Sequence, residues 1–431
     1  MRNHPERYAL SNELHARPFP ELAAPCRAVF LAIRPEDGAE RDRALDRAHL
    51  LDLLDRHGAS HPPPGASHYS ASLGRVRLKW ESHTEFVTYT LFADGVAETP
   101  FDGKTLGQFP ADWLEAAPGD VLSSALVRVE AAETAAAAEA RLTERLIPHF
   151  VRESLAISRV LDGGALIASD FRIHEHDQIR FAAIVTPEIG PRRVGRLVQR
   201  LLEIETYKTA AMLTLPVARK IAGRVNELDR ELSGLVQAMG DADAADTERL
   251  ERLLKMSGEI EAMSAGSAFR FGAAGAYEAI VGERIEVLRE ERIGGRQTFG
   301  EFMARRFAPA MRTCRSAERR LNELAERTGR AADLLSTRVD VGLAQSNREL
   351  LRSMDRRAAL QLRLQQTVEG FSVVAISYYS VSLAGYALGP LAAAIGMSET
   401  WLTAAVTIPI LVLVWLFVRR VREGITKDDR G

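Results

Sequence analysis

The sequence predicts an α+β N-terminal domain, then a long helical stalk or bundle, then a C-terminal two-helix transmembrane hairpin. Three observations support this fold class: strand-like alternation before Pro191, helical periodicity from there to Glu369, and two charge-free runs near the C-terminus. We expect an α+β cytoplasmic domain at 1–190, a helical bundle and long stalk helix at 191–369, transmembrane helices at 370–395 and 400–418, and a basic cytoplasmic tail at 419–431.

The composition is that of an ordinary globular chain. It is 46% hydrophobic and 26% charged with a net charge of -2, so we expect no nucleic-acid binding. Cys26 and Cys314 are far apart in the sequence, and they cannot build a disulfide framework or a thiolate metal site within one chain. No apolar run of signal-peptide length opens the chain, so the bulk is expected in the cytoplasm.

The first domain mixes strands and helices in the order βαββαβαβββ. Alternating apolar residues predict strands at 26–33, 74–82, 84–92, 121–129, 154–162, 165–173 and 178–186. Helices are expected at 38–58, 111–116 and 131–146. This order is typical of an α+β domain with a largely antiparallel sheet.

The middle of the chain is helical in pattern. Pro216 is expected to kink or end the helix that starts at Pro191, and a turn is expected at 240–246. Gly294 and Gly295 mark the next break. The last helix carries an apolar heptad seam of Met303, Phe307, Ala310, Cys314, Ala317, Leu321 and Leu324.

That last helix meets no strong breaker before the membrane. Roughly 60 residues at about 1.5 Å each would make a rod of about 90 Å. Two interpretations remain open: the helices only pack on one another as antiparallel hairpins, or the stalk also pairs with other copies. We expect hairpins for the earlier helices and homo-oligomer contacts for the stalk.

The two charge-free runs, 370–395 and 400–418, are each long enough to cross a bilayer, which takes about 20 apolar residues. A pair of buried helices in a soluble fold is the alternative. The short loop between the runs has no Lys or Arg, whereas arginines flank both outer ends. These are Arg352, Arg356, Arg357 and Arg363 before the first span, and Arg419, Arg420 and Arg422 after the second. The positive-inside rule therefore places both termini in the cytoplasm.

The first span is rich in hydroxyl and small residues, which favour helix association within the hairpin or between copies. Local bonding of serine to its own helix is the simpler alternative. Neither span has an ionisable group at mid-membrane, so the usual marker of a proton relay is missing.

Candidate polar sites in the first domain are few. The sequence has no P-loop, GxGxxG before a helix, HExxH or GxSxG motif. His174 and His176 are expected to share one face of a strand, as half of a metal site or as solvated edge residues. A candidate ligand or partner site comprises Glu13, His15, Arg17, His83 and Glu85. The simpler interpretation is that the first three pin the N-terminal segment to the sheet.

Four segments resemble the DUF3422 family of bacterial membrane-anchored proteins across nearly the full chain. They are NELHARPFP, WESHTEFVTYTLF, GRLVQRLLEIETY and the stretch from TRVDVGLAQSNRELL through SYYSVSLAGY. The resemblance implies a membrane anchor and no established activity.

The layout is also similar to that of CorA-type magnesium channels, in which a Gly-Met-Asn signature ends the first span. The loop here reads Gly396, Met397, Ser398 and Glu399, with Ser398 in place of the asparagine. The analogy implies a candidate pore loop in an oligomer, with Mg²⁺ or another divalent cation as the transported ion.

Two hypotheses of function follow, with a third that rests only on scattered His and Glu residues. The first is a non-enzymatic scaffold or sensor without cofactors, anchored in the bacterial inner membrane and able to form homo-oligomers through the stalk and first transmembrane helix. The alternative is a CorA-like divalent cation channel. The third is an enzyme that uses the N-terminal domain.

Overall fold

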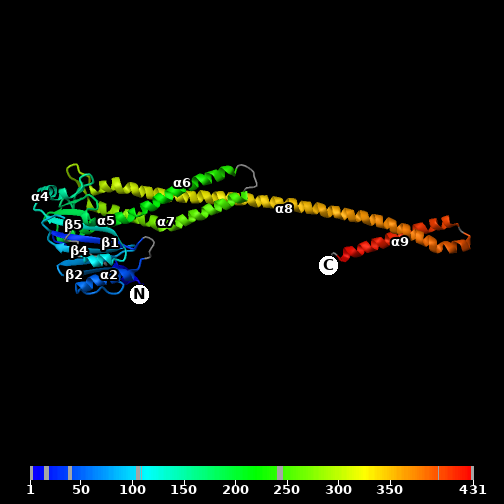
Figure 1. Cartoon of the computed structure of the whole chain (residues 1–431), viewed down its shortest axis with the longest axis horizontal. Helices are drawn as coiled ribbons and strands as arrows, with labels where there is room; N and C mark the ends of the chain where they lie inside the picture. Colours follow the sequence, from blue (N-terminus) through cyan, green and yellow to red (C-terminus); the bar gives the residue numbers. More distant parts are fainter. Residues whose placement is uncertain are drawn as a thin grey trace. The chain divides into compact units, whose positions relative to one another are not determined.

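A computed structural model describes residues 3–13, 19–36, 41–102, 107, 109–239, 246–396 and 398–428. The chain divides into two compact units, Met1–Ala332 and Asp333–Gly431. The first unit contains a mixed sheet and the helices that cover it, and the second contains the remainder of helix α8 and helix α9 (Figure 1).

The first unit is built on a nine-stranded sheet with the order β2-β3-β4-β1-β5-β8-β7-β6-β9. Its β5–β8 pair is parallel and the other paired strands are antiparallel, which confirms the largely antiparallel α+β domain. The strands are β1 Cys26–Arg34, β2 His68–Leu73, β3 Val76–Ser82, β4 Val87–Asp94, β5 Asp120–Ala131, β6 Ala156–Val160, β7 Ala165–Ser169, β8 Ile179–Val185 and β9 Glu291–Arg292.

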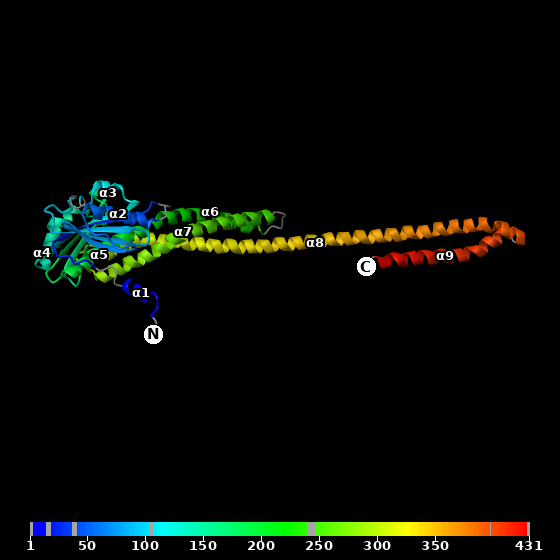
Figure 2. The ribbon, with the colours of Figure 1, turned by 90° about the horizontal axis from the view of Figure 1, so that it is seen from below.

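One face of the sheet carries the main hydrophobic core. Helices α2 (Arg43–Arg56) and α3 (Ala111–Glu115) lie on this side, and helix α4 (Ala135–Arg141) adds Ala138 to the same core (Figure 2). Alternate residues of β1 and β3, including Leu31 and Trp80, pack here with Leu50 and the fully buried Trp113. The period-two alternation of the strands assigns these side chains to this face.

Helix α5 (Pro191–Met212) lies against the opposite face (Figure 2). The N-terminal segment, which includes helix α1 (Arg7–Glu13), approaches α5 at Gly195. A Cβ on Gly195 would lie 1.6 Å from the carbonyl oxygen of Pro20, so only glycine permits this approach. The Leu22 amide also donates to the Pro191 carbonyl at 3.1 Å. Residues 20–22 are thereby fixed against α5.

Helices α6 (Thr214–Ala238), α7 (Asp246–Leu288) and α8 (Phe299–Ile395) follow. The break predicted at Pro216 is confirmed, because α5 ends at Met212 and α6 restarts at Thr214. The turn predicted at 240–246 lies outside the described residues, except that Asp246 begins α7.

The N-terminal part of α8 packs against α6 and α7. Arg327 pairs with Asp229 of α6, and Thr328 Oγ1 donates to the sulfur of Met256 on α7 at 3.9 Å. The predicted heptad residues of this part are buried apart from the half-buried Ala310: Met303, Phe307, Cys314, Ala317, Leu321 and Leu324. This stretch of the seam is therefore covered within one chain.

In the second unit, α8 continues to Ile395 and α9 spans Glu399–Asp428. Each helix contains a stretch long and apolar enough to cross a membrane, with mean hydropathy of 1.4 within Phe299–Pro390 and 2.4 within Thr400–Arg420. Only 6% of either stretch is buried, unlike the core helices of a soluble fold. The structure therefore confirms the predicted C-terminal pair of long apolar helices joined by a short loop.

Candidate functional site

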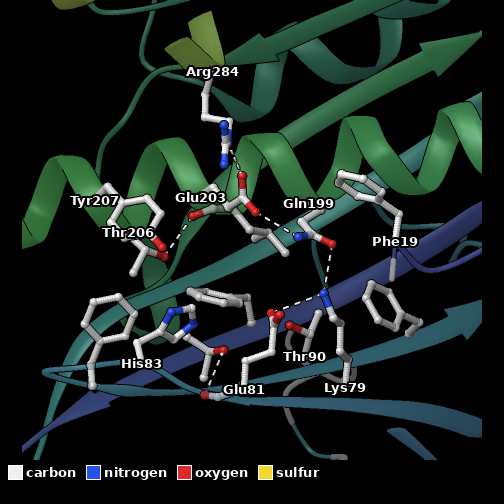
Figure 3. A pocket seen from close by; sticks show the side chains of 15 residues that line it. Phe19, Lys79, Glu81, His83, Thr90, Gln199, Glu203, Thr206, Tyr207 and Arg284 are labelled. Atoms are coloured by element: carbon white, nitrogen blue, oxygen red, sulfur yellow. Dashed lines mark hydrogen bonds and ion pairs between the residues drawn. The ribbon is translucent and has the colours of Figure 1, made fainter. Parts of the chain in front are cut away.

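A cavity of about 260 Å³ lies between α5 and the face of the sheet opposite the main hydrophobic core (Figure 3). Strands β1, β3 and β4 form its floor, and α5 forms its roof. The wall mixes aromatic and polar side chains: Phe19, Phe30, Lys79, Glu81, His83, Phe86, Thr88, Thr90, Phe92, Gln199, Leu202, Glu203, Thr206, Tyr207 and Arg284.

Five polar side chains form a continuous chain of hydrogen bonds and ion pairs across this cavity. Lys79 Nζ lies 3.2 Å from a carboxylate oxygen of Glu81 and donates to Gln199 Oε1 at 2.8 Å. Gln199 Nε2 donates to Glu203 at 2.8 Å, and Arg284 of α7 pairs with the other Glu203 oxygen. Figure 3 shows the strand residues facing the α5 residues across the space.

The local sequence explains how these groups meet. Lys79 and Glu81 are two residues apart in β3, so they share the face opposite Trp80. Gln199 and Glu203 are four residues apart, so they share one face of α5. The side chains of Lys79 and Glu81 are only 9% and 13% exposed, and each charge therefore needs its partner.

The formal charges around the cavity balance. Lys79 and Arg284 supply two positive charges, and Glu81 and Glu203 supply two negative charges. Lys79 is held by its ion pair with Glu81 and its hydrogen bond to Gln199. The arrangement can orient a polar ligand.

An aromatic cluster lines one end of the cavity. The His83 ring stacks on Phe86 with centroids 4.6 Å apart and meets Tyr207 edge-on at 6.4 Å. Tyr207 in turn stacks on Tyr277 of α7, with centroids 5.4 Å apart. Burial, together with a hydrogen bond to Glu85, raises the pKa of Tyr277, so its phenol stays protonated.

The sequence-predicted candidates are only partly brought together. His83 lines the cavity, whereas Glu85 turns towards α7, where it pairs with Arg270 and accepts from the Tyr277 hydroxyl at 2.7 Å. His15 and Arg17 lie outside the described residues, and for Glu13 the structure describes only its place at the end of α1. The proposed grouping of these five residues therefore stays a prediction.

The candidate pore loop is described in part. Gly396, directly after α8, has a positive φ of 74°, and Ser398 is exposed. Met397 lies outside the described residues, and Glu399 is described only as the first residue of α9. A role of this loop in a pore also stays a prediction.

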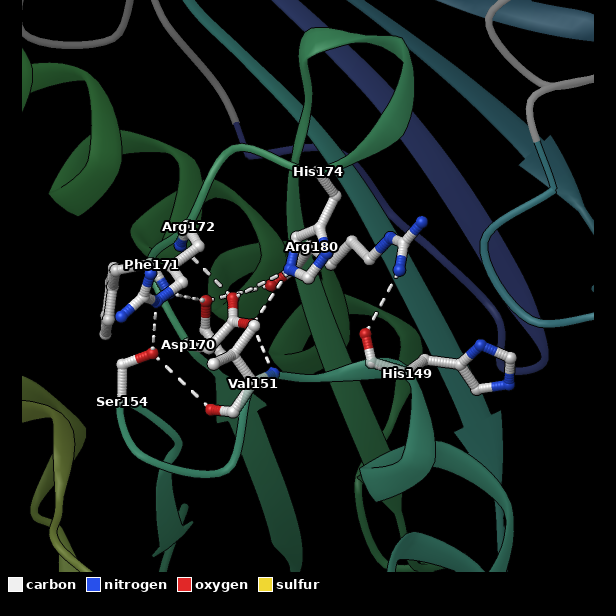
Figure 4. A network of polar contacts seen from close by, with 9 residues as sticks. His149, Val151, Ser154, Asp170, Phe171, Arg172, His174 and Arg180 are labelled. Carbon is white, nitrogen blue, oxygen red and sulfur yellow. Dashed lines mark hydrogen bonds and ion pairs between the residues drawn. The ribbon is translucent and has the colours of Figure 1, made fainter.

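The prediction that His174 and His176 share one face of a strand is wrong. Residues Glu175–Asp177 form a short 3₁₀ turn, and His176 has a φ of 65°, because the chain reverses there between β7 and β8. His174 Nε2 instead contacts the buried carboxylate of Asp170 at 2.8 Å, and that carboxylate also accepts from the Val151 amide at 2.7 Å (Figure 4). No cluster of three or more metal-ligating side chains occurs in the described parts of the chain.

The Asp170 cluster is a structural unit. The Asp170 carboxylate is fully buried and also accepts from the Arg172 amide at 3.1 Å, so three donors satisfy it. Arg172 Nε donates in turn to the Ser154 hydroxyl at 2.9 Å (Figure 4). These bonds hold the β7–β8 connection in place and leave little free capacity for a ligand.

Sequence reasoning missed most of the cavity: Lys79, Glu81, Gln199, Glu203, Thr206, Tyr207 and Arg284. A signal was present in β3, where charged residues alternate with apolar ones and where Leu78, Lys79 and Trp80 are all buried. A second signal was the spacing of Gln199 and Glu203, four residues apart on one face of α5 among the buried Leu201, Leu202 and Ile204. The contribution of Arg284 depends on how α7 packs, which periodicity does not give.

Comparison with known proteins agrees with the motif resemblance and adds no activity. No protein of curated function matches the chain. A family model described as "Protein of unknown function (DUF3422)" matches residues 2–425, nearly the full length. The chain therefore belongs to the DUF3422 family.

Proposed function

We propose that this protein is a non-enzymatic, membrane-anchored sensor whose α+β domain binds a small zwitterionic molecule in the cavity beneath α5. The observation that carries the proposal is the charge-balanced chain from Lys79 through Gln199 to Glu203, in a cavity that aromatic side chains also line. Ligand sites are typically apolar cavities with a few convergent polar groups.

The ligand class follows from the lining. Two positive and two negative side chains disfavour a ligand of strong single charge, whereas an ammonium could meet Glu81 or Glu203 and a carboxylate could meet Lys79 or Arg284. The phenylalanine rings offer an apolar wall for the rest of the molecule. A free amino acid has this combination of groups and a size suited to about 260 Å³.

The anchor supports a position at the bacterial inner membrane with both termini in the cytoplasm. Arginines lie on α8 before the first apolar stretch and at the end of the second, and the connecting loop has none. Under the positive-inside rule, this distribution favours a cytoplasmic sensor domain.

The proposal is tested by calorimetric titration of the full chain in lipid nanodiscs with each of the twenty amino acids. We expect at least one to bind, and Gln199→Leu to weaken that binding about 10-fold, because a buried hydrogen-bond link between the Lys79 and Glu203 ends is lost. Gln237→Leu, an exposed glutamine of α6, is the matched control and should bind like the wild type.

Two outcomes would contradict the proposal. One is that no amino acid binds. The other is that Gln199→Leu and Gln237→Leu bind the same ligand equally well, which would place the ligand outside the cavity.

The alternative function is a CorA-like oligomeric channel for divalent cations, and the observation that favours it is the exposed surface of α8 in the second unit. Leu350, Met354 and Tyr378 are each more than half exposed there, and homo-oligomer contacts through the stalk and first transmembrane helix would cover such side chains. Mass measurement of the protein in nanodiscs discriminates: a ring-forming oligomer supports a channel, whereas a monomer or dimer removes it.

A further inference from the structure

A second cavity of about 630 Å³ lies beside the first within the same unit, and His83, Phe86 and Tyr207 line both. It is formed by the first turns of α2, the loop before β2, the β3–β4 connection and part of α7. Its lining residues are Arg43, Ala44, Arg47, Gly65, Ala66, Ser67, Trp80, Ser82, His83, Thr84, Phe86, Tyr207, Tyr277 and Ile280.

The charge of this lining differs from that of the first cavity. Arg43 and Arg47 are its charged side chains, and no acidic residue occurs among the described residues that line it. Arg43 forms no ion pair with any residue that the structure describes. Arg47 donates to the carbonyl oxygens of Pro62 and Pro63, at 2.8 and 3.1 Å, which fixes its guanidinium without neutralising it.

The nearest carboxylates are already engaged. Asp46 pairs with Arg41 at 2.7 Å, and Glu85 pairs with Arg270. Asp42 caps α2 by accepting from the Ala44 amide at 2.7 Å. Asp42 thus already occupies the positive end of the α2 dipole, and it is the two arginines, neither paired with a described carboxylate, that favour an anion in this cavity.

Aromatic side chains also line the cavity. Tyr207 and Tyr277 are stacked with an interplanar angle of 30°, and Trp80 and His83 also line the space. Flat aromatic surfaces of this kind bind planar rings by stacking, and a purine or pyrimidine is such a ring. A volume of about 630 Å³ lies within the usual range for small-molecule sites.

We propose that the second cavity binds a nucleoside phosphate, with the phosphate at Arg43 and Arg47 and the base against the Tyr207–Tyr277 pair. This site is separate from the zwitterion site and goes beyond the sensor function proposed above. The shared wall of His83, Phe86 and Tyr207 places the two ligands side by side.

The test is calorimetric titration of the full chain in nanodiscs with the 5′-monophosphates of adenosine, guanosine, cytidine and uridine. We expect at least one to bind, adenosine or another unphosphorylated nucleoside to bind more weakly, and added salt to lower the affinity. Inorganic phosphate should compete only at high concentration, because it lacks the ring.

Two arginines of α2 provide a matched pair of variants. Arg43→Gln removes one charge at the cavity and should weaken nucleotide binding about 10-fold, as for loss of a charge-assisted contact. Arg56→Gln removes the same charge from the last turn of α2, where Arg56 pairs with Asp52 and Asp112 outside the cavity, and should bind like the wild type. Both side chains are on the surface, so neither change should prevent folding.

Three results would overturn the proposal. They are the absence of binding by all four nucleotides, equal binding by Arg43→Gln and the wild type, and equal weakening by Arg43→Gln and Arg56→Gln. Gln199→Leu in the first cavity should leave nucleotide affinity unchanged, so failure of the zwitterion proposal would be distinguished from failure of this one.

Discussion

The two thiols of this chain are both buried, with exposed fractions of 2% for Cys26 and 3% for Cys314. Burial, with a smaller contribution from Asp94, raises the pKa of Cys26 to about 12, and burial also raises the pKa of Cys314. The thiolate is the reactive form, so both residues should be inert at neutral pH.

We therefore expect no reaction with Ellman's reagent at pH 8 in the native protein and two thiols per chain in denaturant. The measurement is the absorbance of the released thionitrobenzoate. One or two reactive thiols per native chain would contradict the burial of these side chains. Fewer than two reactive thiols in denaturant would contradict the finding that both cysteines are free thiols.

His49 should make stability depend on pH. Its Nε2 lies 2.8 Å from the Trp113 carbonyl and therefore carries the proton, and its Nδ1 accepts from the Tyr89 hydroxyl at 3.1 Å. Burial lowers the pKa of His49, so below about pH 6.5 the unfolded chain binds a proton that the folded chain does not. The free energy of unfolding is therefore highest above that pH and falls as the pH decreases, by at most about 1.4 kcal/mol per pH unit.

Urea unfolding followed by tryptophan fluorescence at pH 7.5 and 5.5 measures this slope. His49→Gln should reduce the slope without abolishing it, because burial also lowers the pKa of His149. Asp46 has a raised pKa with the opposite sign and interacts electrostatically with His49, so the difference between the two slopes measures His49 together with its effect on Asp46. An unchanged slope in the variant would show that His49 does not contribute.

At the scale of single residues, sequence patterns identified His83 but not its surroundings. His83 stands two residues before Glu85 in the sequence, and the two were predicted to belong to one site. In the structure His83 lines the cavity, whereas Glu85 pairs with Arg270. Lys79 and Gln199 are 120 positions apart in sequence. Their contact depends on α5 crossing the sheet at one particular place, and local periodicity does not contain that information.

At the scale of elements, the first amides of helix α8 are bonded by a side chain nine residues earlier in the chain. Glu290 accepts from the Phe299 amide at 2.9 Å and the Gly300 amide at 2.7 Å, and it also bonds the Ser158 hydroxyl of β6. A carboxylate at this position satisfies free amides and complements the helix dipole. The start of α8 is thereby joined to the sheet.

Glu290→Gln should loosen this junction and lower the free energy of unfolding by about 1 to 2 kcal/mol, as for loss of a helix N-cap. Hydrogen exchange with mass spectrometry should show faster exchange at 296–303. Glu291→Gln, a neighbouring exposed residue, is the control and should exchange like the wild type. Equal protection in both variants would exclude this capping role.

Most of the elements were predictable because each is encoded by local periodicity. Strands β1, β3, β4, β5 and β8 carry strong apolar alternation or apolar runs, and the break before Pro216 follows from the proline itself. Strand β2 was missed because HYSASL is small and polar, and it pairs only with β3 at the sheet edge. Strand β9 has two residues, and its pairing with β6 comes from tertiary contact alone.

At the scale of the whole molecule, packing and composition divide the chain at different places. The change in texture at Pro191 predicted a boundary there, yet the sheet and helices α5 to α7 form one compact unit that ends at Ala332. The physical reason is that α5 covers the sheet, while Glu203–Arg284 and Glu85–Arg270 pairs tie α7 to α5 and to the β3–β4 connection. A change in the type of secondary structure along the chain is therefore not necessarily a boundary between compact units.

The orientation of the apolar hairpin gives the last prediction, which uses the inertness of the native thiols. Ser398→Cys places a thiol in the loop between the two spans, and Ser346→Cys places one on α8 before the first span; both serines are exposed. If the arginine-flanked ends of the hairpin lie in the cytoplasm, the loop between the spans lies on the outer side of the membrane. A membrane-impermeant maleimide added to spheroplasts should then label only Ser398→Cys.

After permeabilisation, both variants should be labelled and the wild type should stay unlabelled. Selective labelling of Ser346→Cys in intact cells would show the opposite orientation. The loop, which has no Lys or Arg, would then lie in the cytoplasm, contrary to the positive-inside rule. Labelling of both from outside would mean that the apolar stretches do not span the bilayer. The sensor proposal needs the first result, since it requires the cavity domain and its proposed cytoplasmic ligand on the same side of the membrane.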